Sequence, residues 1–164
     1  MTTVKEQFGR DKVTDLVKTS ERIVPVGRLD MYTSGALILT NDGDFIYKVT
    51  HPKNEITKTY TVTLKGQVSD EEIEKLRQGV VLDDGFITSP AKVKRIMEDK
   101  ENNKTRLEII IHEGKNREVR RMCESIDKKV LALHRSKIGT ISLDGLTIGK
   151  WRYLTPKEID SLQK

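Results

Sequence analysis

The segment 57–64 alternates cleanly between two sets of positions. Lys58, Tyr60, Val62 and Leu64 occupy one set, and threonines occupy the other. Because successive side chains of a strand point to opposite faces of a sheet, this pattern predicts a strand with one polar face. Strands of this kind are typical of antiparallel sheets that pack one face on a core. The segment therefore constrains the chain to a fold built around such a sheet.

Further strands are expected on both sides of this segment. Pro25 interrupts the first of them, which predicts an edge position because proline cannot donate to a neighbouring strand. Two of the others read as a hairpin around the polar turn 98–104. The expected strands are 22–26, 36–40, 86–97, 106–111, 130–138 and 141–143.

Helices are indicated between these strands. Ser69 and Thr155 each precede a glutamate by three positions, the spacing of a capping box, and Pro156 suits a first helical position. Another helix is expected from about Arg117, with its apolar residues recurring at offsets of three and four. A short helix is expected at 44–49. The chain is thus predicted to be an α+β domain with a mostly antiparallel, mixed sheet flanked by helices and loops.

Composition limits the class of protein. The chain has 164 residues, 30 Lys and Arg against 25 Asp and Glu, and a formal charge of +5. This excess attracts polyanions, although a charged surface alone gives the same count. Cys123 has no second cysteine to pair with, which fits a reducing compartment. With no apolar leader in residues 1–15 and no apolar run of about 20 residues, we expect a cytoplasmic, monomeric single domain with no membrane partner.

A first candidate site is the segment 27–35, Gly-Arg-Leu-Asp-Met-Tyr-Thr-Ser-Gly. It places one carboxylate, Asp30, between two strands. Such an aspartate often caps backbone N–H groups of a turn. It can equally be a catalytic group on a loop that faces a cleft. The residues alone leave both interpretations open.

A second candidate site gathers cations around the start of the helix expected near residue 117. The positive end of a helix dipole makes cations there slightly unfavourable unless an anion is present. Phosphates would satisfy both these cations and the free N–H groups of the first turn. A solvated basic face is the alternative. The cations are Lys115, Arg117, Arg120 and Arg121, and the neutral Asn116 lies among them.

Taken together, several segments resemble the RsuA/RluB family of ribosomal RNA pseudouridine synthases. The resemblance covers nearly the whole chain, with the motifs in the family's order. They are Gly27-Arg28-Leu29-Asp30, Thr33-Ser34-Gly35 with Leu37 to Gly43, Lys58-Thr59-Tyr60, Asn116 to Met122, and Gly149 to Thr155.

The resemblance implies roles for particular residues. Asp30 is expected to be the catalytic aspartate, Tyr60 the aromatic that stacks on a flipped uracil, and Arg120 the basic partner of Asp30. Arg28 is expected beside the base and a flanking phosphate. Lys115, Asn116, Arg117 and Arg121 are expected to bind RNA phosphates around a central cleft.

The expected reaction is the isomerisation of a uridine in ribosomal RNA. It transfers no electrons and no phosphoryl group, so no redox or nucleotide cofactor is expected. No histidine or cysteine pair has zinc-like spacing, so no metal site is expected. A non-catalytic RNA-binding or ribosome-associated module would carry the same cations, and a hydrolase using Asp30 is a weaker alternative.

The resemblance also bears on the start of the chain. Family members usually begin with a small RNA-binding domain and a strand with a Lys-Pro-x-Gly motif. This chain begins at Met1-Thr2-Thr3-Val4, which the resemblance places just after that strand. We therefore expect residues 1–164 to be an N-terminally shortened catalytic domain.

Overall fold

A mixed sheet forms the centre of the computed structural model, which describes residues 22–163. The expectation about the start of the chain falls outside these residues. β2 pairs with β7 in parallel, and every other neighbouring pair of the sheet is antiparallel. The strands run in the order β2 (Thr33–Gly35), β7 (Val130–Ile138), β4 (Lys58–Lys65), β6 (Lys104–Ile111) and β5 (Lys92–Asp99), and β8 (Ile141–Ser142) also pairs with β7.

The strand predicted from alternation, β4, is confirmed and lies inside the sheet between β6 and β7. Val62 and Leu64 are fully buried against the helices, as the pattern requires. The strand expected at 86–97 was wrong in its first half, because β5 begins at Lys92. Pro90 has no N–H for a ladder, and the Ala91 N–H donates instead to the Arg77 carbonyl at 3.0 Å.

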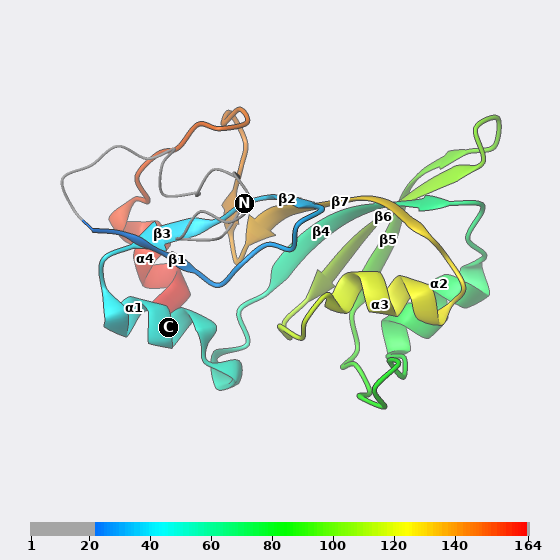
Figure 1. Cartoon of the computed structure of the whole chain (residues 1–164), viewed down its shortest axis with the longest axis horizontal. Helices are drawn as coiled ribbons and strands as arrows, with labels where there is room; N and C mark the ends of the chain where they lie inside the picture. Colours follow the sequence, from blue (N-terminus) through cyan, green and yellow to red (C-terminus); the bar gives the residue numbers. More distant parts are fainter. Residues whose placement is uncertain (1–21, 164) are drawn as a thin grey trace.

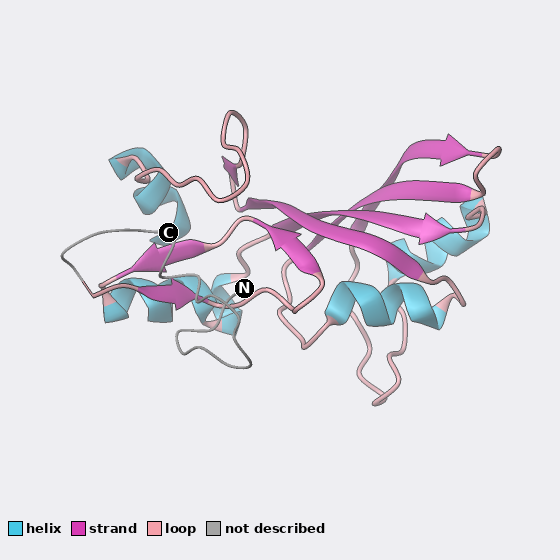
Figure 2. Cartoon of the chain, turned by 45° about the horizontal axis from the view of Figure 1, so that its top comes forward, coloured by secondary structure: helices cyan, strands magenta, loops and turns pink. Residues whose placement is uncertain are grey.

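Two helices, α2 (Asp70–Gln78) and α3 (Glu118–Ser125), cover one face of this sheet in both views (Figures 1 and 2). The predicted capping box at Ser69 is present, since its side chain accepts from the Glu72 N–H and the Glu72 carboxylate accepts from the Ser69 N–H. The apolar stripe of α3 is buried as predicted. It consists of Val119, Met122, Cys123 and Ile126, which pack with Val62, Leu64, Leu107 and Ile109.

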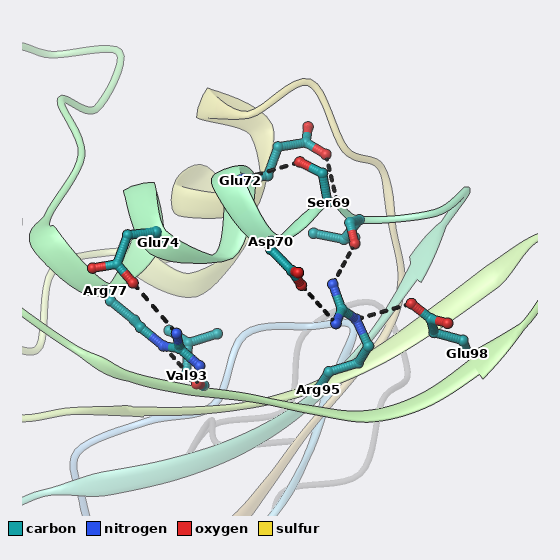
Figure 3. Close-up of polar contacts among 9 residues, drawn as sticks. Ser69, Asp70, Glu72, Glu74, Arg77, Val93, Arg95 and Glu98 are labelled. Atoms are coloured by element: carbon teal, nitrogen blue, oxygen red, sulfur yellow. Dashed lines mark hydrogen bonds and ion pairs between the residues drawn. The ribbon is translucent and has the colours of Figure 1, made fainter.

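Two arginines fasten α2 to the neighbouring strand β5 (Figure 3). Arg77 of the helix donates to the Val93 carbonyl through Nε at 3.0 Å and Nη2 at 2.9 Å. Arg95 of the strand pairs with Asp70 at 2.9 Å and with Glu98 at 3.1 Å. These contacts fix the helix on the sheet face that carries the main core.

A second core lies at the other end of the molecule, where α1 (Gly43–Thr50) and α4 (Pro156–Gln163) pack on the two-stranded sheet of β1 (Val24–Val26) and β3 (Ile38–Thr40) (Figure 1). Pro25 lies on an edge strand as predicted, because each strand of a two-stranded sheet is an edge. A short 3-10 helix, η2 (Pro52–Asn54), follows α1. Within residues 22–163, no helix is long and apolar enough to span a membrane.

Candidate active site

Between the two cores lies a cleft of about 480 Å³. The loop after β1 forms one wall, and β4 and β7 form its floor. The loop after β6 and the first turn of α3 form the opposite wall. Its charged lining comprises five cations, Arg28, Lys58, Lys115, Arg117 and Arg135, and three carboxylates, Asp30, Glu113 and Glu118.

Asp30 lies in the cleft lining, partly buried, in the loop that joins β1 to β2. Its carbonyl accepts from the Thr33 N–H at 3.0 Å, which closes a turn just before β2. The turn is anchored because β2 pairs with β7 in parallel. The carboxylate is therefore presented from a loop whose far end is part of the main sheet.

Gly35, at the end of β2, makes this anchoring possible. Its φ of +125° is strained for any residue with a side chain, and a Cβ there would overlap the Arg135 carbonyl oxygen. The buried Arg135 side chain donates to the Ala36 carbonyl through Nε at 2.9 Å and Nη2 at 2.7 Å. The chain leaving the Asp30 loop is thus clamped to β7 by close backbone contact and by a guanidinium.

Tyr60 reaches the same cleft from β4, where it is half-buried beside Lys58. The register of β4 against β7 shifts between Thr59 and Tyr60. Such a bulge re-aims the following side chain relative to a regular strand. The structure thus brings together Asp30 and Tyr60, which are distant in sequence.

Arg120 is buried behind the Asp30 loop and is absent from the cleft lining. Its Nη2 donates to the Tyr32 carbonyl at 2.7 Å. Among residues 22–163 no ion pair links it to Asp30, and its buried Nε has no partner there. Arg120 therefore contacts the loop of Asp30, and its expected pairing with the carboxylate stays a prediction.

The expected RNA-binding residues divide into two groups. Arg28, Lys115, Asn116 and Arg117 are exposed and line the cleft. Arg121 does not, because its guanidinium pairs with Asp83 at 2.7 Å and Asp84 at 2.8 Å and donates to the Asn116 carbonyl at 3.0 Å. Its side chain holds the backbone of the loop before α3 through the Asn116 carbonyl.

The loop before α3 has an unusual backbone. Arg117, the residue before the helix, adopts φ 51° and ψ 35°, the left-handed region, and its side chain caps nothing. Non-glycine residues held there are often found at functional sites. Lys115 packs its ammonium 4.5 Å from the centre of the Phe86 ring. Lys115 and Arg117 are thus both exposed on a loop whose last residue has a left-handed backbone.

Sequence reasoning missed four charged residues of the cleft as a group: Lys58, Glu113, Glu118 and Arg135. Burial and the nearby Glu113 carboxylate raise the pKa of Glu118 to about 7. Burial, and then the charge of Arg135, lower the pKa of Lys58. Lys58 belongs to the Lys-Thr-Tyr motif, which was a usable signal. Glu118 lies inside the motif from Asn116 to Met122, which was a second usable signal. Nothing local marked Glu113 and Arg135 as members of the same site.

Metal ligands do not gather in this region. Within the described part of the chain, no group of three His, Cys, Asp or Glu residues could hold a metal ion.

The fold is that of the pseudouridine synthases. A crystal structure of a pseudouridylate synthase superposes with a TM-score of 0.85 at 31% identity, over 94% of this chain and 66% of that one. An H/ACA ribonucleoprotein solved with a substrate RNA containing 2′-deoxyuridine shares the fold at a TM-score of 0.56, with 12% identity over 74% of this chain and 40% of that one.

The chain belongs to the RNA pseudouridylate synthase family, whose sequence model matches residues 2–125. It is 45% identical to ribosomal large subunit pseudouridine synthase B of Bacillus subtilis over 97% of this chain and 65% of that protein. It is 36% identical to the dual-specificity RNA pseudouridine synthase RluF of Escherichia coli K12 over 97% of this chain and 52% of that protein. The chain therefore spans about half to two thirds of the length of these relatives. The family membership expected from the sequence motifs is confirmed.

Proposed function

We propose that this chain isomerises a uridine of ribosomal RNA to pseudouridine, with Asp30 as the catalytic carboxylate. The observation that carries the proposal is a single cleft that holds Asp30 and Tyr60 beside exposed cations. Phosphate binding alone gives no reason for a carboxylate among those cations. The names of the relatives, which act on ribosomal RNA or on RNA, support the same substrate class.

The reaction breaks the bond between ribose C1′ and uracil N1 and joins C1′ to C5. The C5 proton leaves and N1 gains a proton, so atoms and electrons balance without a redox partner. An ionised Asp30 can attack the ribose or base as a nucleophile, or remove a sugar proton as a base. Tyr60 offers a ring on which the extruded uracil stacks.

Cations on the cleft rim hold the RNA backbone. Arg28 is exposed next to Asp30, where it can contact the flipped nucleotide and its phosphate. Lys115 and Arg117 face the cleft from the opposite wall and suit flanking phosphates, and Asn116 lies between them. Arg120 acts on Asp30 as a positioning residue through the Tyr32 carbonyl.

One chain supplies every residue assigned to this cleft, so a monomer suffices for the proposed reaction. A cytoplasmic location is part of the same proposal, because ribosomal RNA is the proposed substrate.

The test replaces Asp30 with asparagine, which keeps the size of the side chain but is neither a nucleophile nor a strong base. Ribosomal RNA transcripts carrying tritium at uracil C5 release label on isomerisation. We expect Asp30→Asn to lower the rate at least about 10²-fold, the usual cost of losing such a group. Circular dichroism and RNA affinity should change little.

Asp144→Asn is the matched control, because Asp144 is an exposed carboxylate outside the cleft lining. It should release tritium at the wild-type rate. Turnover by Asp30→Asn close to wild type refutes the catalytic assignment. RNA binding by the wild-type chain without any tritium release favours a non-catalytic RNA-binding module instead.

A further inference from the structure

Two glutamates face one another in the wall of the cleft, and the proposed reaction uses neither. Glu118 opens α3 and is 3% exposed. Its Oε1 accepts from the Lys115 N–H at 3.0 Å. Its Oε2 is buried and has no hydrogen-bond partner among the described residues. A buried carboxylate oxygen without a donor is costly, so this atom requires an explanation.

Glu113, in the loop after β6, already has donors on both oxygens. Oε1 accepts from the Ser89 N–H at 2.9 Å, and Oε2 accepts from the Ser89 hydroxyl at 3.2 Å. Both carboxyl oxygens of Glu113 thus act as acceptors. A hydrogen bond between the two carboxyl groups therefore forms only when Glu118 carries the proton.

The surroundings of Glu118 favour that protonated form. Desolvation is the largest cause that raises the pKa of Glu118 to about 7, followed by a hydrogen bond and charge repulsion from Glu113. The Lys115 N–H and the charge of Lys58 on β4 act in the opposite direction. The charge of Lys58 is the smallest of these causes. Burial and the charge of Arg135 on β7 lower the pKa of Lys58 itself.

The loop between the two glutamates presents the cations of the cleft. Residues 114–117 include Lys115, whose N–H is bound by Glu118, and Arg117, whose left-handed backbone needs support from its surroundings. Glu113 fixes one end of this loop to Ser89, and Glu118 fixes the other end to α3. A bond between the two carboxyls closes the loop.

We propose that Glu118 is a positioning residue whose neutral carboxyl group donates to Glu113 and so holds the 114–117 loop in its RNA-binding conformation. Deprotonation replaces this bond by repulsion between the buried Glu118 carboxylate and the half-buried Glu113 carboxylate. It also raises the number of negative side chains among the eight charged residues of the lining from two to three. RNA affinity should then fall as the pH rises through neutrality. The effect on turnover rests on the proposed function, whereas the carboxyl pair does not.

The kinetic test compares wild type with Glu118→Gln and Glu118→Ala on tritium-labelled ribosomal RNA transcripts. From about pH 6 to about pH 8 the wild-type KM should rise about fivefold or more, a typical size for coupling between two sites. kcat should change much less. The glutamine amide accepts from Lys115 and donates to Glu113 as the neutral acid does, so its KM should stay level. Glu118→Ala should have a raised KM at every pH.

Glu101→Gln, on the exposed turn between β5 and β6, is the matched control and should follow the wild-type profile. Identical pH profiles of KM for wild type and Glu118→Gln overturn the proposal.

A direct measurement separates this idea from the reaction itself. Carbon-13 NMR of labelled glutamate carboxyls in the free protein should show one group titrating near neutral pH, and Glu118→Gln should lack it. Affinity for a fluorescein-labelled stem-loop RNA, measured by anisotropy, should follow that titration in wild type only. Suppose that no tritium is released, but one carboxyl titrates near neutral pH and RNA affinity follows that titration. The proposed function then fails and the carboxyl pair stands. If every glutamate titrates near its usual pKa, the pair is refuted.

Discussion

Replacing Glu118 with glutamine should make the unfolding free energy less dependent on pH. The folded-state pKa of about 7 is above the ordinary value of 4.5, so the folded protein holds the proton more tightly than the unfolded chain. The stabilisation from this group is therefore complete below pH 4.5. It is lost as the pH rises to about 7 and changes no further above that.

The size of the effect follows from the rise in pKa. From 4.5 to about 7 it corresponds to a loss of about 3 kcal/mol between acid and neutral pH, since each pKa unit is worth about 1.4 kcal/mol. Such a change is a large part of the stability of a domain of this size. Glutamine does not titrate, so the variant should lack this loss. Its free energy of unfolding should therefore increase relative to that of wild type as the pH rises.

Urea unfolding of both proteins at a series of pH values measures the difference. The free energy of Glu118→Gln minus that of wild type should increase by up to about 3 kcal/mol across this range. Titrating groups that do not interact with Glu118 are common to both proteins and cancel. Parallel curves for the two proteins contradict the pairing of Glu118 with Glu113, whatever the RNA measurements give.

Two further predictions concern the loops around the cleft. Lys115→Ala with Arg117→Ala should flatten the slope of log RNA affinity against log salt by about 1.4, at about 0.7 for each single-strand phosphate contact. Arg121→Ala should leave this slope unchanged, because its guanidinium is held by Asp83 and Asp84, and an equal loss of slope would show that it reaches phosphate. Gly35→Ala should lower the urea midpoint and tritium release together, because a Cβ overlaps the Arg135 carbonyl, and wild-type values for both would refute the clamp.

Much of the fold could be predicted because its elements have strong local signals. The alternation of β4 and the capping box at Ser69 each reflect one element and its own burial pattern. β2 has no such signal, since Thr33–Gly35 is short, polar and ends in glycine. It is a strand only because β7 pairs with it. Parallel pairing over a long sequence separation leaves no mark in a three-residue segment.

The candidate site was predicted in part for the same reason. Motifs indicated Asp30, Tyr60 and the cations before α3, and the structure places most of them in one cleft. The burial of Glu118 and Arg135 could not be predicted, because charged residues are usually exposed and their partners come from distant segments. A cluster of basic residues gives their number but not the direction of each side chain.

Arg120 and Arg121 show why the direction of a side chain cannot be inferred from a cluster of basic residues. Adjacent residues of a helix point about 100° apart, so neighbours in sequence reach different partners. Arg120 donates to the Tyr32 carbonyl in the Asp30 loop, and Arg121 donates to the Asn116 carbonyl in the cationic loop.

Arg135 on β7 also binds a backbone carbonyl, because its guanidinium donates to the Ala36 oxygen. The three arginines together fix the backbone around the cleft, a task that suits a planar group with several donors better than a lysine ammonium. Under the proposed function, the exposed cations before α3 and beside Asp30 are the ones that bind phosphate. On that proposal, the arginines of this protein divide between those that hold the cleft backbone and those that bind the substrate.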